Sequence, residues 1–150
     1  MATIRVQTAD FDIGAEIARL TAGHTGIGGI SAFVGTVRGG EVAGLTLEHY
    51  PGMTERAMAD IVARAAARWP LYGCTVIHRV GVLKPGENIV LVLTASAHRE
   101  AALAATAFLI DWLKTAAPFW KKETRADGSV AWVEARESDE NAAAAWLAER

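Results

Sequence analysis

The chain has 150 residues, 51% hydrophobic and 21% charged, which is globular composition and excludes intrinsic disorder. A net charge of -2 gives no general reason to expect nucleic acid as a partner, and a single cysteine excludes an intrachain disulfide and a cysteine-rich metal site. The sequence has no signal-peptide pattern and no apolar run of about 18 residues. We therefore expect one domain spanning residues 1–150, located in the cytoplasm.

The first third of the chain predicts a strand, a helix and a longer strand. Residues 3–6 form the first strand, and the helix follows an N-cap at Asp10 and ends near Gly23. Residues 29–37 (GISAFVGTV) are β-branched and apolar enough for a mostly buried strand. That strand delivers Arg38 beside two glycines, where a planar guanidinium can meet a phosphate or carboxylate. A surface arginine at a hairpin explains this pattern equally well.

The middle of the chain predicts a strand at residues 45–50, a helix that Pro70 ends, and two strands at residues 74–80 and 88–95. The last two are joined by a loop carrying Lys-Pro-Gly-Glu, which favours a hairpin. Cys74 opens the first of these two strands and has no basic neighbour in sequence to activate it. We interpret it as a small core residue.

The next helix begins where the sequence reads Ser-Ala-His-Arg. His98 and Arg99 therefore lie near a helix N-terminus, where free N–H groups and the helix dipole favour an anion. An ordinary cap region with exposed side chains explains the same two residues equally well.

The end of this helix carries the most unusual stretch of the chain, FLIDWLKTAAPFWKKE at residues 108–123. Lys114, Lys121 and Lys122 lie beside aromatic residues where the helix must stop. A partly desolvated lysine has a lowered pKa and can act as nucleophile, proton donor or anion clamp. On spacing alone, a solvated lysine fringe beside core or interface aromatics is the commoner arrangement.

The last part of the chain predicts a second hairpin and a short helix. The strands are residues 121–125 and 130–135, on either side of an Asp-Gly turn, and Arg136 follows them. Ser138 is expected to cap an alanine-rich helix that carries Trp146.

The predicted order is β-α-β-β-α-β-β-α-β-β-α, with hairpins rather than regular βαβ units. This order indicates an α+β fold on a mainly antiparallel sheet. Several basic residues fall at the ends of elements, where sites usually form, and if they converge they make a strongly cationic pocket for a phosphorylated or polyanionic small substrate. These residues are Arg38, His98, Arg99, Lys114, Lys121 and Arg136.

Several common chemistries lack their sequence patterns. There is no His/Cys/carboxylate cluster with metal-ligand spacing, no phosphate-binding Gly-x-x-x-x-Gly-Lys loop and no serine in a nucleophile elbow. Chemistry would therefore rest on lysine, histidine and arginine as acid/base groups and oxyanion stabilisers, with any nucleophile brought from outside.

Six segments closely resemble the large, catalytic subunit of molybdopterin synthase, the MoaE family, in the family's order and over nearly the whole chain. They are FVGTVR (33–38), LEHYPGMTE (47–55), HRVGVLKPGE (78–87), SAHR (96–99), DWLKTAAPFWKKE (111–123) and WVEAR (132–136). The LKT…APFWK block is highly specific. The resemblance implies an α/β hammerhead-type fold with an added small antiparallel subdomain.

The resemblance also implies a function, that of a sulfurtransferase in molybdenum cofactor biosynthesis. Enzymes of this family install two sulfurs in cyclic pyranopterin monophosphate and so make the dithiolene of molybdopterin. The sulfur arrives as a thiocarboxylate on the C-terminal glycine of a small ubiquitin-like carrier subunit, and no metal or other cofactor is expected. Two large subunits form a homodimer with a small subunit at each end, giving a heterotetramer.

Carried over by motif, the resemblance assigns roles to individual residues. Lys114 and Lys121 would be the central catalytic lysines, with Lys114 nearest the carrier's terminal carbonyl. Substrate binding would fall to Phe33, Arg38, His98, Arg99 and, across the dimer interface, Arg136. The loop after Arg38, GGEVAG, is short for the family.

Two other classes of function fit the lysine-rich stretch. A non-catalytic docking module for a ubiquitin-like protein would use Phe119, Trp120 and the basic fringe to grip a C-terminal tail. Such a module predicts that Lys114→Ala weakens tail binding and that no small substrate binds. An unrelated lysine Schiff-base enzyme would require borohydride trapping of a carbonyl substrate on Lys114.

Overall fold

The structure is a computed structural model that describes residues 2–133 and 137–148. In chain order its elements are β1 (Ala2–Gln7), α1 (Ile13–Thr21), β2 (Gly29–Thr36), β3 (Val42–His49), α2 (Met53–Arg68), β4 (Leu71–Arg79), β5 (Gly81–Leu83), β6 (Asn88–Ser96), α3 (Arg99–Ala116), β7 (Phe119–Arg125), β8 (Val130–Val133) and α4 (Glu137–Ala148).

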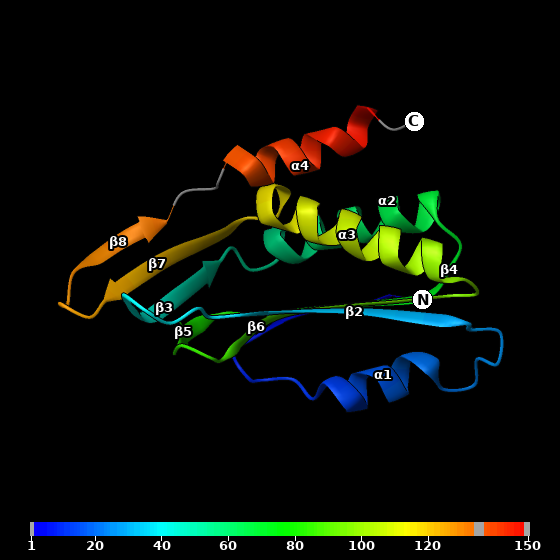
Figure 1. Cartoon of the computed structure of the whole chain (residues 1–150), viewed down its shortest axis with the longest axis horizontal. Coiled ribbons are helices and arrows are strands. Elements are labelled where there is room, and N and C mark those ends of the chain that lie inside the picture. Colours follow the sequence, from blue (N-terminus) through cyan, green and yellow to red (C-terminus); the bar gives the residue numbers. More distant parts are fainter. Residues whose placement is uncertain (1, 134–136, 149–150) are drawn as a thin grey trace.

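The larger of two sheets has the strand order β1-β4-β6-β2. β1 pairs with β4 in parallel, whereas β6 pairs with β4 and β2 in antiparallel fashion. Figure 1 shows α1 on one face of this sheet, α2 and α3 on the other, and α4 on the outer side of α3. Because helices cover both faces, β4 and β6 are buried on both sides, which explains their nearly continuous apolar sequences.

The second sheet is wholly antiparallel, has the order β5-β3-β7-β8, and lies to one side of the first (Figure 1). β5 belongs to the connection between β4 and β6, so the predicted β4–β6 hairpin is present but its loop pairs with the second sheet. The α+β prediction, with mainly antiparallel pairing and a small added antiparallel part, is confirmed.

The main core lies between the larger sheet and the helices α2 and α3. Met58 and Ile61 of α2 meet Val76, Val92 and Leu109, and none of these side chains is more than 2% exposed. Their helical spacing on α2 is the one that the sequence pattern predicts. Fully burying such a side chain contributes roughly 1.5–3 kcal/mol, so this core holds the ends of α3 and β7 in place.

Several element ends differ from the sequence predictions; β4 begins at Leu71 rather than residue 74, and β7 at Phe119 rather than residue 121. The N-cap of α1 is Asp12, whose Oδ1 accepts a hydrogen bond from the backbone N–H of residue 15, and the helix ends at Thr21 rather than near residue 23. Asp10 instead accepts hydrogen bonds from the backbone of residue 11 and from the Asn88 side chain, so it ties the loop to β6.

Further differences lie in β3, α4 and β8. β3 begins at Val42 rather than residue 45, because pairing with β7 recruits part of the short loop after Arg38. α4 begins at Glu137, so Ser138 lies in its first turn and is not the cap. The strand predicted to residue 135 is described to Val133 only.

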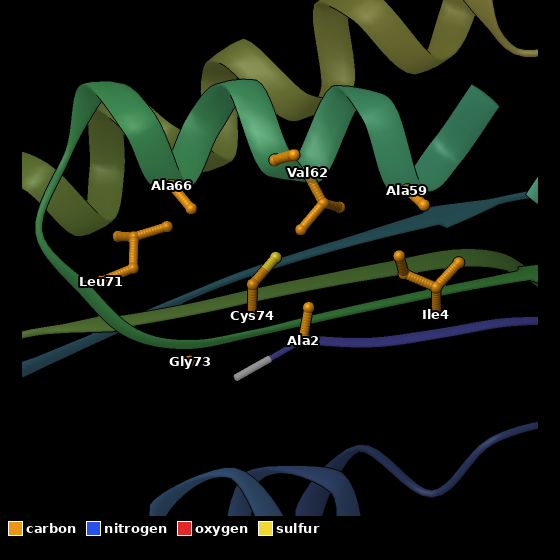
Figure 2. A pocket seen from close by; sticks show the side chains of 9 residues that line it. Ala2, Ile4, Ala59, Val62, Ala66, Leu71, Gly73 and Cys74 are labelled. Carbon is orange, nitrogen blue, oxygen red and sulfur yellow. The ribbon is translucent and has the colours of Figure 1, made fainter. Parts of the chain in front are cut away.

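A small apolar cavity of about 250 Å³ lies between α2 and the β1–β4 edge of the larger sheet (Figure 2). Val62 and Ala66 of α2 face Ile4 and Cys74 across it. Burial raises the pKa of the Cys74 thiol to about 12, which keeps it protonated and unreactive. The interpretation of Cys74 as a small core residue is confirmed, since it is 3% exposed.

Candidate active site

A larger cleft, of about 790 Å³, opens where the two sheets and the C-terminal end of α3 meet. Its lining includes Phe33 from β2, Arg38 from the following loop, Lys114 from the last turn of α3 and Lys121 from β7. The structure thus brings together four residues that the sequence analysis proposed for the site, from separate segments of the chain.

Hydrogen bonds hold in place the two segments that carry Arg38 and Lys121. Val37 donates its N–H to the Glu87 carbonyl at 2.9 Å and accepts from the Gly86 N–H at 2.8 Å, which holds the Arg38 loop against the β5–β6 turn. On the other side, the Thr54 hydroxyl donates to the Pro118 carbonyl at 2.9 Å. This second contact ties the start of β7 to α2.

Strand alternation decides which lysine of β7 faces the cleft. Phe119, Lys121 and Glu123 line the cleft, and Lys122 points to the other face of the strand. The Lys122 ammonium lies 5.0 Å from the ring centroid of Trp132, a cation–π contact on the outer face of the sheet. The three lysines of the stretch are therefore not equivalent.

Lys121 is a partly buried amine next to a second amine. Burial lowers the pKa of Lys121, and the positive charge of Lys114 lowers it further, while the carboxylates of Asp139 and Glu123 act in the opposite direction. The net effect is a lowered pKa, which makes Lys121 a better proton donor and, once deprotonated, a base.

The cleft is not uniformly basic, in contrast to the strongly cationic pocket that the sequence suggested. Three carboxylates, Glu41, Glu123 and Asp139, line it together with Arg38, Lys114 and Lys121. The carboxylates of Asp139 and Glu123 favour the protonated form of Lys121, against the effects of burial and of the Lys114 charge.

Asp139 was not anticipated from the sequence, because only the packing of α4 brings it to the cleft. The Trp146 indole N–H donates to the Asp111 carboxylate at 2.7 Å, which anchors α4 to α3 one turn before Lys114. The Arg68 guanidinium also lies 5.3 Å from the Trp146 ring centroid. No local pattern in the sequence signals this placement.

His78 is another residue of the cleft that the sequence analysis did not single out. It is 8% exposed and stacks on Phe119 with ring centroids 3.7 Å apart and planes at 17°. Burial lowers the pKa of His78 to about 4, and the nearby Lys121, His49 and Lys114 also lower it. The sequence signal that could have pointed to His78 is a single histidine within the mostly apolar sequence of β4.

Two further predicted residues lie elsewhere, and a third is not described. His98 is the N-cap of α3 and Arg99 its first residue, at the opposite end of an 18-residue helix from Lys114. At about 1.5 Å per residue the helix is about 27 Å long, so these side chains do not join the cleft of the same chain. Arg136 lies outside the described residues.

The described residues contain no group of three or more histidine, cysteine or carboxylate side chains arranged to hold a metal ion. Within the same residues, no helix is long and apolar enough to cross a membrane.

The fold and the cleft define an α+β protein with two lysines in a mixed-charge site. The sequence model of the MoaE protein family matches residues 6–116. The chain is 56% identical over 147 residues to the molybdopterin synthase catalytic subunit of Mesorhizobium japonicum, covering 96% of this chain and 92% of that protein. It is 57% identical over 150 residues to the one of Ralstonia nicotianae, covering 97% and 85%.

Solved structures show the same similarity. The molybdopterin biosynthesis MoaE protein of Burkholderia ambifaria superposes with a TM-score of 0.85 at 53% identity, over 98% of this chain and 99% of that one. A chain from the complex of subunits 1 and 2 of the Helicobacter pylori molybdopterin-converting factor shares the fold, with a TM-score of 0.70 at 20% identity over 91% and 90%. The chain belongs to the MoaE family.

Proposed function

We propose that this chain is a molybdopterin synthase catalytic subunit, which transfers sulfur from the C-terminal thiocarboxylate of a small ubiquitin-like carrier to cyclic pyranopterin monophosphate. The single observation that supports this most strongly is the convergence of Lys114, Lys121 and Arg38 in one cleft. The names of similar proteins support the same reaction, and this chain spans 92% and 85% of the length of two of them.

The chemistry of the transfer suits this set of side chains. Sulfur replaces oxygen on the substrate and oxygen replaces sulfur on the carrier, so the transfer needs no oxidant, reductant or resident metal. Lys114 stabilises negative charge on the carrier's acyl oxygen, and Lys121, with its lowered pKa, exchanges the proton as sulfur leaves. Arg38 holds the substrate phosphate through its planar fork of donors.

The partner follows from the same proposal. The carrier supplies the nucleophilic sulfur, so this chain requires no catalytic cysteine, in keeping with the buried Cys74. Two such chains form a homodimer that binds a carrier at each end, and in this proposal the assembly acts in the cytoplasm. His98 and Arg99, which do not line the cleft of their own chain, would serve a cleft of the partner chain, and so would Arg136.

The decisive experiment mixes the purified protein with thiocarboxylated carrier and cyclic pyranopterin monophosphate and measures molybdopterin. We expect Lys114→Ala and Lys121→Ala to lower turnover at least about 100-fold, because each removes a charge or proton from the reacting atoms. Lys122→Ala is the matched control, since it removes an ammonium from the same strand but on the opposite face.

Carrier binding, measured by calorimetry on the same variants, separates this proposal from the docking module. An enzyme keeps most of its carrier affinity when Lys114 is replaced but loses turnover. A docking module would lose affinity for the tail, and its wild-type form would bind no small substrate and make no product.

A further inference from the structure

The protonation pattern of the His78 ring is fixed by one backbone contact. Nδ1 lies 2.7 Å from the carbonyl oxygen of Arg79. A carbonyl oxygen can only accept a hydrogen bond, so Nδ1 must carry the proton and donate it. Because burial lowers the pKa of His78 to about 4, the ring is neutral near pH 7, and Nε2 then carries an unprotonated lone pair.

The rest of the ring is held as firmly as Nδ1. One face is covered by Phe119, at 3.7 Å between ring centroids, and the side chain as a whole is 8% exposed. A buried aromatic pair at this spacing leaves the imidazole little rotational freedom. Nε2 therefore keeps one direction relative to the cleft that the side chain lines.

Nε2 has no hydrogen-bond partner within residues 2–133 and 137–148. The buried side-chain atoms without a partner in the described residues are Arg5 Nε and Trp112 Nε1, so Nε2 of His78 is open to water at the cleft. A ligand that displaces this water must offer a donor in its place, or the acceptor is left unpaired at a cost. Its position in the wall of the cleft makes a bound ligand the natural source of that donor.

The wall around His78 suits a flat ring rather than a phosphate. Apolar and aromatic side chains line the cleft on this face of the sheet, among them Phe33, Ile110, Leu113 and Val90, which pairs with His78 across the strands. The cations Arg38, Lys114 and Lys121 supply donors for a phosphate and for the carrier, but they cannot accept a hydrogen bond. A neutral acceptor among apolar side chains can instead accept a hydrogen bond from an N–H at the edge of a heterocycle.

We propose that Nε2 of His78 accepts a hydrogen bond from a ring or exocyclic N–H of the substrate's heterocycle, and so orients the heterocycle in the cleft and selects for it. This inference rests on the proposed function, because it takes the pterin as the substrate. His78 is a residue of specificity and orientation, whereas the lysines act at the reacting atoms.

Nitrogen-15 NMR of histidine-labelled protein tests the inference directly, because the chain has only 4 histidines. The His78 signals are identified by their loss in His78→Phe, which keeps an aromatic ring against Phe119 but has no acceptor. We expect the Nε2 resonance of His78 to move on addition of cyclic pyranopterin monophosphate, and to stay in place on addition of inorganic pyrophosphate.

Kinetics of variants give an independent measure. His78→Phe should raise the KM for the pterin at least about tenfold, because the substrate N–H would be buried without a partner, and should change kcat much less. His78→Gln, whose amide oxygen can reach toward the position of Nε2, should recover part of that loss. His24→Phe, a substitution outside the cleft lining, is the matched control.

The outcomes separate this inference from the proposed function. If the wild type binds the pterin and makes product while the Nε2 resonance stays in place, or if His78→Phe keeps the wild-type KM, the role of His78 is overturned and the proposed function stands. If the wild type neither binds the pterin nor makes product with a competent carrier, both are overturned.

Discussion

Lys114 in the last turn of α3 and Lys121 in β7 line the same cleft, and the charge of Lys114 contributes to the lowered pKa of Lys121. The two amines come from different kinds of element, and the turn after α3 that joins them is tied to α2 through the carbonyl of Pro118. Because α3 and β7 are held by the main core and the second sheet, this pair is kept close despite its mutual repulsion.

Removing the charge of Lys114 should raise the pKa of Lys121. Burial, the larger cause of the lowered value, remains in Lys114→Ala, so the pKa should rise only part of the way to that of an ordinary lysine. Competitive acetylation of Lys121 as a function of pH, read by mass spectrometry, measures this change. Lys122→Ala, on the opposite face of β7, should leave the labelling curve where it is, and an unchanged curve in Lys114→Ala would contradict the coupling.

Removing a carboxylate should move the same pKa in the opposite direction. The charge of Asp139 raises the pKa of Lys121 against the effect of burial, so Asp139→Asn should lower it further. The acetylation curve should then move to lower pH. Asp60→Asn is the matched control, because Asp60 lies on the exposed face of α2 and pairs with Arg64. A shift of equal size in both variants would argue against a local effect of Asp139.

The sequence predicted most of the fold because helical periodicity, turn residues and apolar strands are local signals. It placed α2 and the β7–β8 hairpin close to their observed ends. It missed β5, whose three residues are too few for a pattern, and it placed the α1 cap at Asp10 because two similar aspartates stand close together. Caps and very short strands depend on tertiary pairing that the local sequence does not record.

The candidate site was predictable only in part, and for a physical reason. Phe33, Arg38, Lys114 and Lys121 were proposed from element ends and from the family resemblance, and the cleft brings them together. Asp139 reaches the cleft through the packing of α4 on α3, and the state of His78 depends on its burial and its contact with a carbonyl. Neither property can be inferred from neighbours in the sequence.

The hydrogen bond between Trp146 and Asp111 should contribute measurably to the anchoring of α4. Trp146→Phe keeps an aromatic ring against Phe108 but removes the indole N–H that donates to the Asp111 carboxylate at 2.7 Å. A bond to a charged acceptor contributes about 1.5–3 kcal/mol, so the free energy of unfolding, measured with urea, should fall by roughly that amount. Amide hydrogen exchange within residues 137–148 should also become faster. Leu147→Ala replaces a side chain that is 52% exposed on the same helix. It should change the free energy of unfolding by no more than about 0.5 kcal/mol and leave the exchange rates nearly unchanged.

A buried carboxylate far from the cleft should make stability depend on pH. Burial raises the pKa of Glu16, but hydrogen bonds from Arg19 and Arg5 outweigh it, and the net pKa lies below the ordinary value of 4.5. A group whose pKa is lowered by folding contributes stability above its unfolded pKa and loses it as the pH falls through the folded value. The free energy of unfolding of the wild type should therefore decline as the pH falls from about 4.5 through the lower pKa of the folded state. In Glu16→Gln that part of the decline should disappear, because the variant has no carboxylate to pair with the two arginines.

Asp60→Asn is the control. It breaks an ion pair whose side chains are 63% and 55% exposed, so it should leave the dependence of stability on pH nearly unchanged. Parallel curves for Glu16→Gln and the wild type below that pH would show that the arginines do not hold the Glu16 carboxylate.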